Sequence, residues 1–216
     1  MFSLKEVKYS YDKQFQLNLS HWEAPQGAHC LISGPSGCGK STLLHIMAGL
    51  LTPQQGNVII AGQNLQQLKS SALDHFRGQN LGIVFQRQHL LKVLTVLDNL
   101  LLAQHLAHVP ENQKRAFEVL TQLDIIAQQH AYPSTLSQGQ VQRVALARAV
   151  INYPKVILAD EPTASLDDVH CLQVLDLLKN QAQEYNATLV IATHDARIKQ
   201  RFSEQVILEM YYKSTH

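Results

Sequence analysis

The chain has 216 residues, of which 45% are hydrophobic and 16% are charged, and its formal net charge is +1. This composition is that of a globular protein rather than a disordered one, and the near-zero charge argues against a surface that coats nucleic acid. The three cysteines are scattered and odd in number, which argues against a disulfide framework and favours a reducing compartment. The length predicts one large domain, or one domain with an inserted subdomain.

Nothing in the sequence predicts a membrane span. The N-terminus lacks an apolar stretch after a basic start, so it does not resemble a secretory signal. The most apolar stretch, residues 90–103, is too short and too polar to cross a bilayer, because Lys92, Asp98 and Asn99 interrupt it. If the protein works at a membrane, another chain has to supply the membrane part.

In chain order, strand-like and helix-like segments alternate around a helical block. Expected strands lie at residues 2–9, 14–19, 28–33, 57–60, 81–85, 155–159, 188–193 and 205–209, and expected helices at 40–50, 96–107, 111–123, 138–152 and 168–184. The continuously apolar runs within 155–159 and 188–193 are typical of parallel strands buried on both faces. This order predicts an α/β core, residues 1–86 and 153–216, interrupted by a helical subdomain at 87–152.

Between the third expected strand and the first expected helix lies a glycine-rich loop that matches G-x-x-x-x-G-K-[ST]. Its residues are Gly34, Pro35, Ser36, Gly37, Cys38, Gly39, Lys40, Ser41 and Thr42. The glycines let backbone N–H groups turn inward onto phosphate oxygens, and the helix adds its positive dipole end. The pattern predicts that Lys40 reaches the β- and γ-phosphates and that Ser41 binds Mg²⁺.

Two carboxylates, Asp160 and Glu161, end the apolar strand at 155–159. The carboxyl end of a central strand is where α/β proteins bind ligands. In P-loop enzymes the aspartate supports the Mg²⁺ site, and Glu161 would lie where an attacking water must be polarised. A solvated turn is the alternative interpretation, and the position in the sheet favours the functional one.

With these elements in place, the chain resembles the nucleotide-binding domain of ABC transporters. Leu136-Ser137-Gln138-Gly139-Gln140 looks like the signature motif, with Gln138 where a glycine is common. Four further matches follow the family's order: Gln86 looks like the Q-loop glutamine, Ser165-Leu166-Asp167 like the D-loop, His194 like the switch histidine and Tyr11 like the aromatic that stacks on adenine. The resemblance implies a RecA-like P-loop NTPase core of the α/β class, with an N-terminal antiparallel β part and the inserted helical subdomain.

The resemblance also implies the roles of these residues. ATP and Mg²⁺ would be the cofactors, with Ser41, Gln86 and Asp160 at the metal, and Glu161, His194, Lys40 and Gln86 in catalysis. Tyr11, the loop 34–42, Ser137, Gly139 and Asp167 would bind nucleotide. Because the signature cannot reach its own phosphate loop in this family, two copies would form a head-to-tail dimer around two ATP molecules.

The implied partners are integral-membrane permease subunits and a second copy of the chain, with no nucleic acid. The chain would therefore be cytoplasmic and peripheral on the inner face of the cell membrane, held there by the permease. Residues 81–91 look closest to ATPases of the lipoprotein-releasing and macrolide-exporter group, which favours export or lipoprotein release. The alternatives are the ATPase of an ABC importer, a soluble ABC ATPase without transport, and a small-molecule kinase that shares only the phosphate loop.

Overall fold

The structure is a computed structural model, and it describes residues 1–11, 15–164, 167–209 and 211–212. Its strands are β1 (Phe2–Tyr9), β2 (Phe15–Ala24), β3 (His29–Ser33), β4 (Gln55–Ile60), β5 (Gln63–Asn64), β6 (Leu81–Val84), β7 (Val156–Asp160), β8 (Thr188–Ala192), β9 (Glu204–Ile207) and β10 (Tyr211–Tyr212). Its helices are α1 (Lys40–Met47), α2 (Ser70–Asn80), α3 (Val96–Leu106), α4 (Gln113–Gln122), α5 (Gln138–Val150), α6 (Asp168–Glu184) and α7 (Ala196–Lys199). Three short 3-10 helices span Leu65–Gln67, Ile126–Gln128 and Pro133–Thr135.

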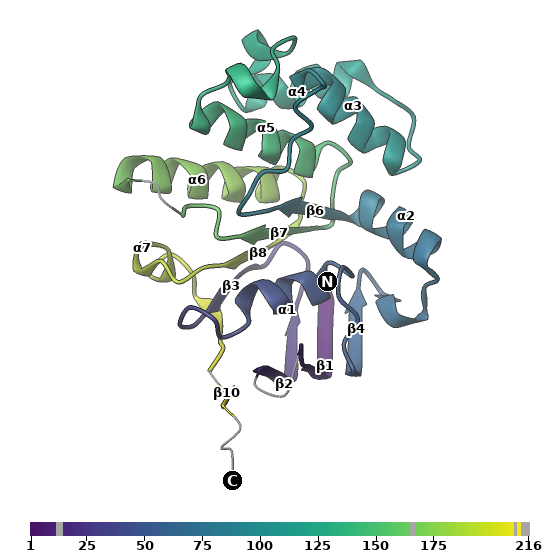
Figure 1. The fold of residues 1–216 in the computed structure, drawn as a ribbon, viewed down its shortest axis with the longest axis vertical. Coiled ribbons are helices and arrows are strands. Elements are labelled where there is room, and N and C mark those ends of the chain that lie inside the picture. The colour runs from purple at the N-terminus through teal and green to yellow at the C-terminus, as the bar shows by residue number, and fades with distance from the viewer. Residues whose placement is uncertain (12–14, 165–166, 210, 213–216) are drawn as a thin grey trace.

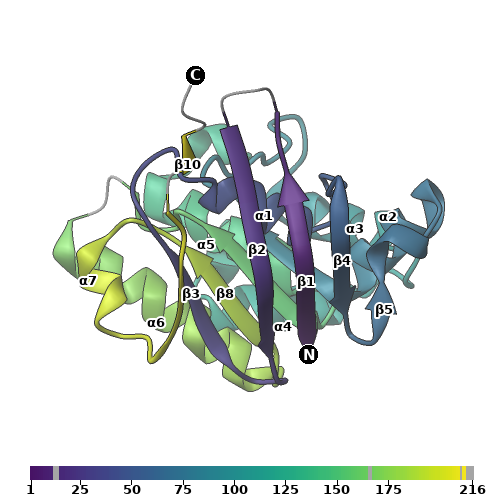
Figure 2. The same cartoon turned by 90° about the horizontal axis from the view of Figure 1, so that it is seen from below.

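The described strands form two sheets of different kinds. One is antiparallel, in the order β10-β2-β1-β4-β5, and the other has the order β6-β7-β8-β3-β9 with every pairing parallel. Figure 1 shows helix α1 between the two sheets, with α3, α4, α5 and α6 on the far side of the parallel sheet. Figure 2 shows the antiparallel strands crossing in front of α1. The predicted α/β class with an N-terminal antiparallel part is confirmed.

The alternation of side chains along the parallel strands builds two cores. Cys30 and Ile32 of β3 face α1 and the antiparallel sheet, whereas Leu31 faces α5 and α6. Because both faces are covered, strands β7 and β8 are buried throughout, as their apolar sequences predicted. The three cysteines are buried and unpaired, in agreement with their scattered positions.

The expected helices and strands are present, with ends shifted by a few residues. Strand β2 extends to Ala24, five residues past the predicted end at 19, and Gln14, the predicted first residue, lies outside the described residues. Helix α2 was not predicted: none of its residues is fully buried, and its apolar face is short, with Leu73 and Phe76 partly buried against the core. Within the described residues, no helix combines the length and apolar character that crossing a bilayer requires.

Candidate active site

The predicted phosphate loop connects strand β3 to helix α1. Gly39 is the N-cap of α1 with φ 100°, a left-handed backbone, and a Cβ at this position would lie 2.8 Å from the ring of Phe15. Lys40 is buried, and its ammonium donates hydrogen bonds to the carbonyls of Gly34 at 3.0 Å and Pro35 at 2.9 Å. The loop therefore curls around the lysine, with a positive charge at the start of α1.

Ser41 and Asp160 meet where strand β7 ends beside the loop. The hydroxyl of Ser41 donates to Oδ1 of Asp160 at 3.0 Å. Burial raises the pKa of Asp160, and the bond from Ser41 and the positive charges of His45 and Lys40 oppose this effect. A hydroxyl and a carboxylate oxygen are the hard ligands that Mg²⁺ prefers, so this pair fits the predicted metal.

Glu161 has an unusual backbone, and each oxygen of its carboxylate has a partner. Its φ of 44° is rare outside glycine and costs of order 1–3 kcal/mol, a strain that tends to occur at functional sites. Thr193 donates to one carboxylate oxygen at 2.8 Å, while Nδ1 of His194 lies 2.7 Å from the other. The carboxylate is mostly buried and the imidazole mostly exposed, so this pair points from the core toward the cavity above the phosphate loop.

A cavity of about 390 Å³ brings most of the predicted residues together. It is lined by Tyr11, Phe15, Ser36, Gly37, Gly39, Lys40, Ser41, Thr42, Gln86, Glu161 and His194. Tyr11 is exposed at its rim and packs edge-on against Tyr9, and its ring centroid lies 5.6 Å from that of Phe15. Cys38, by contrast, turns its side chain into the core, so only its backbone is available to a ligand in the loop.

The residues predicted as the signature begin helix α5. Ser137 is the N-cap, and it forms a capping box: its hydroxyl accepts from the N–H of Gln140, whose side chain accepts from the N–H of Ser137. Gln138 is the first helical residue and is exposed, and its backbone does not have positive φ, so the glycine common at this position is not required here. A Cβ on Gly139 would meet open space.

The signature lines a cavity of its own, of about 530 Å³, together with side chains of helix α6 and Asp167. No described residue lines both this cavity and the one at the phosphate loop. Within one chain, therefore, the signature and the phosphate loop do not share a pocket.

Asp167 is the N-cap of helix α6, while Ser165 and Leu166 of the predicted D-loop lie outside the described residues. Its carboxylate accepts from the N–H of His170 at 2.9 Å and lies 2.8 Å from Nδ1 of that residue. These bonds, led by the one from the backbone N–H, lower the pKa of Asp167. The contact between His170 and Asp167 was not predicted, although the i, i+3 spacing of the two residues at a helix start was a signal for it in the sequence.

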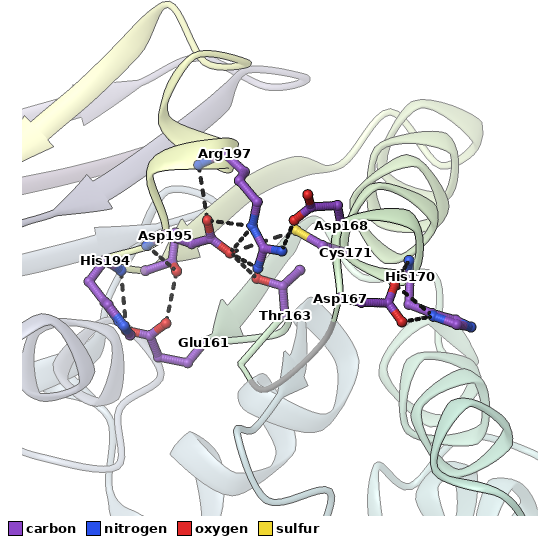
Figure 3. A network of polar contacts seen from close by, with 10 residues as sticks. Glu161, Thr163, Asp167, Asp168, His170, Cys171, His194, Asp195 and Arg197 are labelled. Atoms are coloured by element: carbon purple, nitrogen blue, oxygen red, sulfur yellow. Dashed lines mark hydrogen bonds and ion pairs between the residues drawn. The ribbon is translucent and has the colours of Figure 1, made fainter.

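Sequence reasoning also missed a polar network around Arg197 (Figure 3). Arg197 binds the carboxylate of Asp195 through Nε and Nη2 and that of Asp168 through Nη1. The i, i+2 spacing of Asp195 and Arg197 was visible in the sequence, but Asp168 is 29 residues away, so no local pattern could indicate the bridge.

Comparisons with known proteins point to one family. The model of the family described as ABC transporter matches residues 17–164. The lipoprotein-releasing system ATP-binding protein LolD of Treponema pallidum (strain Nichols) is 42% identical over 179 residues, which cover 82% of this chain and 79% of that protein. The putative hemin import ATP-binding protein HrtA of Staphylococcus epidermidis (strain ATCC 12228) is 40% identical over 177 residues, covering 81% and 79%.

Among solved structures, the fold is similar to the ATP-binding cassette MJ0796, described as dimeric, in a post-hydrolysis state and bound to ADP and Pi. The TM-score is 0.86 at 31% sequence identity, and the match covers 100% of both chains. Relatives named for lipoprotein release and for hemin import are about equally similar, so the identities do not separate one cargo from another.

Proposed function

This chain belongs to the ABC transporter family, as an ATP-hydrolysing subunit that works as a dimer with a separate membrane permease, and we propose a role in ATP binding or hydrolysis for each residue of its candidate active site. The observation that carries the proposal is the cavity of about 390 Å³. There an exposed tyrosine, the phosphate loop, Gln86, Glu161 and His194 converge from five separate parts of the chain.

The loop 34–42 binds the phosphates of ATP. Lys40 exchanges its two carbonyl partners for β- and γ-phosphate oxygens, and the backbone N–H groups at the start of α1 add further donors. Tyr11, exposed at the cavity rim, stacks on the adenine ring. The 31% identical structure with ADP and Pi supports nucleotide binding by this fold.

Ser41, Gln86 and Asp160 hold Mg²⁺, which supplies charge neutralisation for the phosphates when bound. The support is the chemistry of the oxygens: Ser41 and Asp160 are in contact at 3.0 Å, and Gln86 is exposed in the same cavity. Asp160 releases its proton more readily with a cation beside it, which offsets the burial that raises its pKa.

Glu161 is the general base. It accepts a proton from water as the water oxygen bonds to the γ-phosphorus, and the bond from that phosphorus to the bridging oxygen breaks to release ADP. Thr193 and the backbone N–H of His194 hold the carboxylate, at 2.8 and 3.3 Å. The exposed imidazole of His194 then contacts the γ-phosphate and stabilises the charge that develops there.

Ser137, Gly139 and Asp167 act on the nucleotide of the partner subunit rather than on their own. The support is that the signature and Asp167 line one cavity while the phosphate loop lines another. The start of helix α5 offers a positive dipole end to a γ-phosphate, and open space over Gly139 permits the close approach. Each chain therefore contributes half of each site.

Residues 87–152 form the helical subdomain that docks on the permease, and residues 1–86 and 153–216 form the nucleotide-binding core. A groove of about 660 Å³ lies where they meet, lined by parts of α2, α3 and α5. Arg148 of α5 donates to the carbonyls of Gln88 and His89, so the signature helix is bonded to this groove. A short helix of the permease occupies it, which places the chain on the inner face of the cell membrane.

The cargo is an exported molecule or a lipoprotein. The support is the similarity to LolD, named for a lipoprotein-releasing system, over 82% of this chain. Isolation of the chain with its native permease decides the question. A permease with a large domain outside the membrane is expected, whereas one accompanied by a substrate-binding protein would refute export and assign the chain to uptake.

Glu161→Gln tests the catalytic assignment. We expect kcat to fall by about 10²–10⁴-fold, the usual contribution of a general base, while ATP still binds and promotes dimerisation. The control is Glu118→Gln, an exposed glutamate on helix α4, which should keep the wild-type rate. Near-normal turnover of Glu161→Gln would rule out Glu161 as the base.

A further inference from the structure

Arg197 joins two segments that flank the candidate active site. Its Nε and Nη2 lie 2.6–3.0 Å from the carboxylate oxygens of Asp195, in the loop after β8, and its Nη1 lies 2.6 Å from Oδ1 of Asp168, the first residue of helix α6 (Figure 3). The guanidinium uses its planar fork to hold two carboxylates from distant elements, a geometry that lysine cannot reproduce. Both bonds raise the pKa of Arg197, so it remains charged.

One end of this bridge leads to the catalytic base. The N–H of Asp195 donates to the hydroxyl of Thr193 at 3.1 Å, and that hydroxyl donates to Glu161 at 2.8 Å. Asp195 also directly follows His194, so fixing its carboxylate fixes the loop that carries the imidazole. Buried Thr163 and Cys171 contact the same carboxylate, at 3.5 and 3.7 Å, which limits its movement further.

The other end leads to the signature cavity. Asp168 directly follows Asp167, the N-cap of helix α6, and Asp167 lines that cavity beside Ser137. A shift of the loop after β8 therefore reaches Asp167 through the guanidinium of Arg197, beside the buried contact that Asp195 makes with Cys171 of α6. The side chain of Asp168 is 85% exposed, so its bond to Arg197 adds little stability by itself. The bond from Arg197 matters for function because Asp168 is the neighbour of Asp167 in the chain.

We propose that Arg197 is a positioning residue that couples the Glu161–His194 pair of one ATP site to Asp167, which serves the other site of the dimer. The proposal rests on the assignment of Asp167 to the partner's nucleotide. Arg197 touches no substrate; it holds the two loops in the relative position that hydrolysis requires. Loss of Arg197 should lower the turnover rate by a larger factor than it lowers the affinity for ATP, because the phosphate loop and Tyr11 are not part of the bridge.

The test compares Arg197→Met, Arg197→Lys and Asp168→Ala with the wild-type chain in steady-state ATP hydrolysis. For Arg197→Met we expect kcat to fall about tenfold with KM within about twofold, as for an interaction that matters only in the transition state. Arg197→Lys should recover only part of the loss, because one ammonium cannot bind both carboxylates in the same geometry. Asp168→Ala removes the oxygen that accepts from Nη1 of Arg197, and it should lower kcat while leaving Asp195 unchanged.

Arg201→Met is the matched control, since Arg201 is an exposed arginine four residues further along, and it should keep the wild-type kcat. Equal kcat for Arg197→Met and Arg201→Met would overturn the proposal. If Arg197→Met does not fold, Asp168→Ala decides alone: an unchanged kcat refutes the coupling. If kcat falls in these variants but Asp167→Ala hydrolyses ATP at the wild-type rate, the route through Asp167 is refuted. A wild-type chain that does not hydrolyse ATP would contradict the proposed function itself.

Discussion

Replacing Asp195 by asparagine measures how strongly the arginine fork holds the loop after β8. Its bonds with Arg197 lower the pKa of Asp195 from the ordinary value of 3.8 to about 2. At about 1.36 kcal/mol per pKa unit, this difference corresponds to roughly 2 kcal/mol of stability. Since the Asp195 side chain is only 14% exposed but that of Arg197 is 35% exposed, solvent screening reduces the expected value to about 1–2 kcal/mol.

The sign of the effect fixes the pH range in which it appears. The lowered pKa means that the folded chain favours the ionised carboxylate, so the stabilisation is fully present above pH 3.8 and is lost as the pH falls through about 2. Urea unfolding should thus show Asp195→Asn less stable than the wild type by about 1–2 kcal/mol at pH 7. The difference should shrink below about pH 4, because a protonated aspartate resembles asparagine.

A direct titration provides the refutation. The carboxyl ¹³C resonance of Asp195 in the folded chain should report a pKa near 2, and in Arg197→Met it should report a higher value. A value of 3.8 or above in the wild-type chain would contradict the ion pair as the structure places it. If the difference in stability between the wild type and Asp195→Asn stays constant down to pH 2, the substitution changes stability through side-chain packing rather than through charge.

Two further predictions concern other parts of the chain. Asn99→Ala removes a buried amide that accepts from the N–H of Leu91 and donates to the carbonyls of Leu91, Leu94 and Thr95. It should lower the free energy of unfolding by about 2–3 kcal/mol in urea, and a loss below about 0.5 kcal/mol would contradict this. Gly39→Ala should weaken ATP binding in a fluorescent-nucleotide titration, because φ of 100° strains any side chain by about 1–3 kcal/mol; unchanged affinity would mean that the loop rearranges freely.

The parts of the fold that the sequence predicted are those where local pattern and burial coincide. Strands β7 and β8 are buried along their whole length, so their apolar runs identified them. The loop 34–42 was equally readable, because its glycines are required by backbone geometry at fixed spacing. Helix α2 has no fully buried residue, and its apolar period is short, with Leu73 and Phe76 as its large hydrophobic residues against the core.

The site divides in the same way. Lys40, Ser41, Gln86, Glu161 and His194 were predicted because each stands in a short motif, and the structure brings them to one cavity. The bridge through Arg197 could not be found, because an ion pair between residues 29 apart leaves no trace in local spacing. Its discovery depends on the tertiary structure, which brings the start of α6 beside the loop after β8.

On the proposed assignment of Ser137 and Asp167 to the partner's nucleotide, the two helix starts that carry them explain how one chain can present these groups without first rearranging them. The hydroxyl of Ser137 accepts the bond that caps α5, which leaves its hydrogen free to donate to a phosphate oxygen. Asp167 caps α6 through His170, and the bonds from His170 keep its carboxylate ionised. Because both caps hold their side chains at the cavity, closure of the dimer meets a preorganised surface, and the cost of ordering it was met when the chain folded.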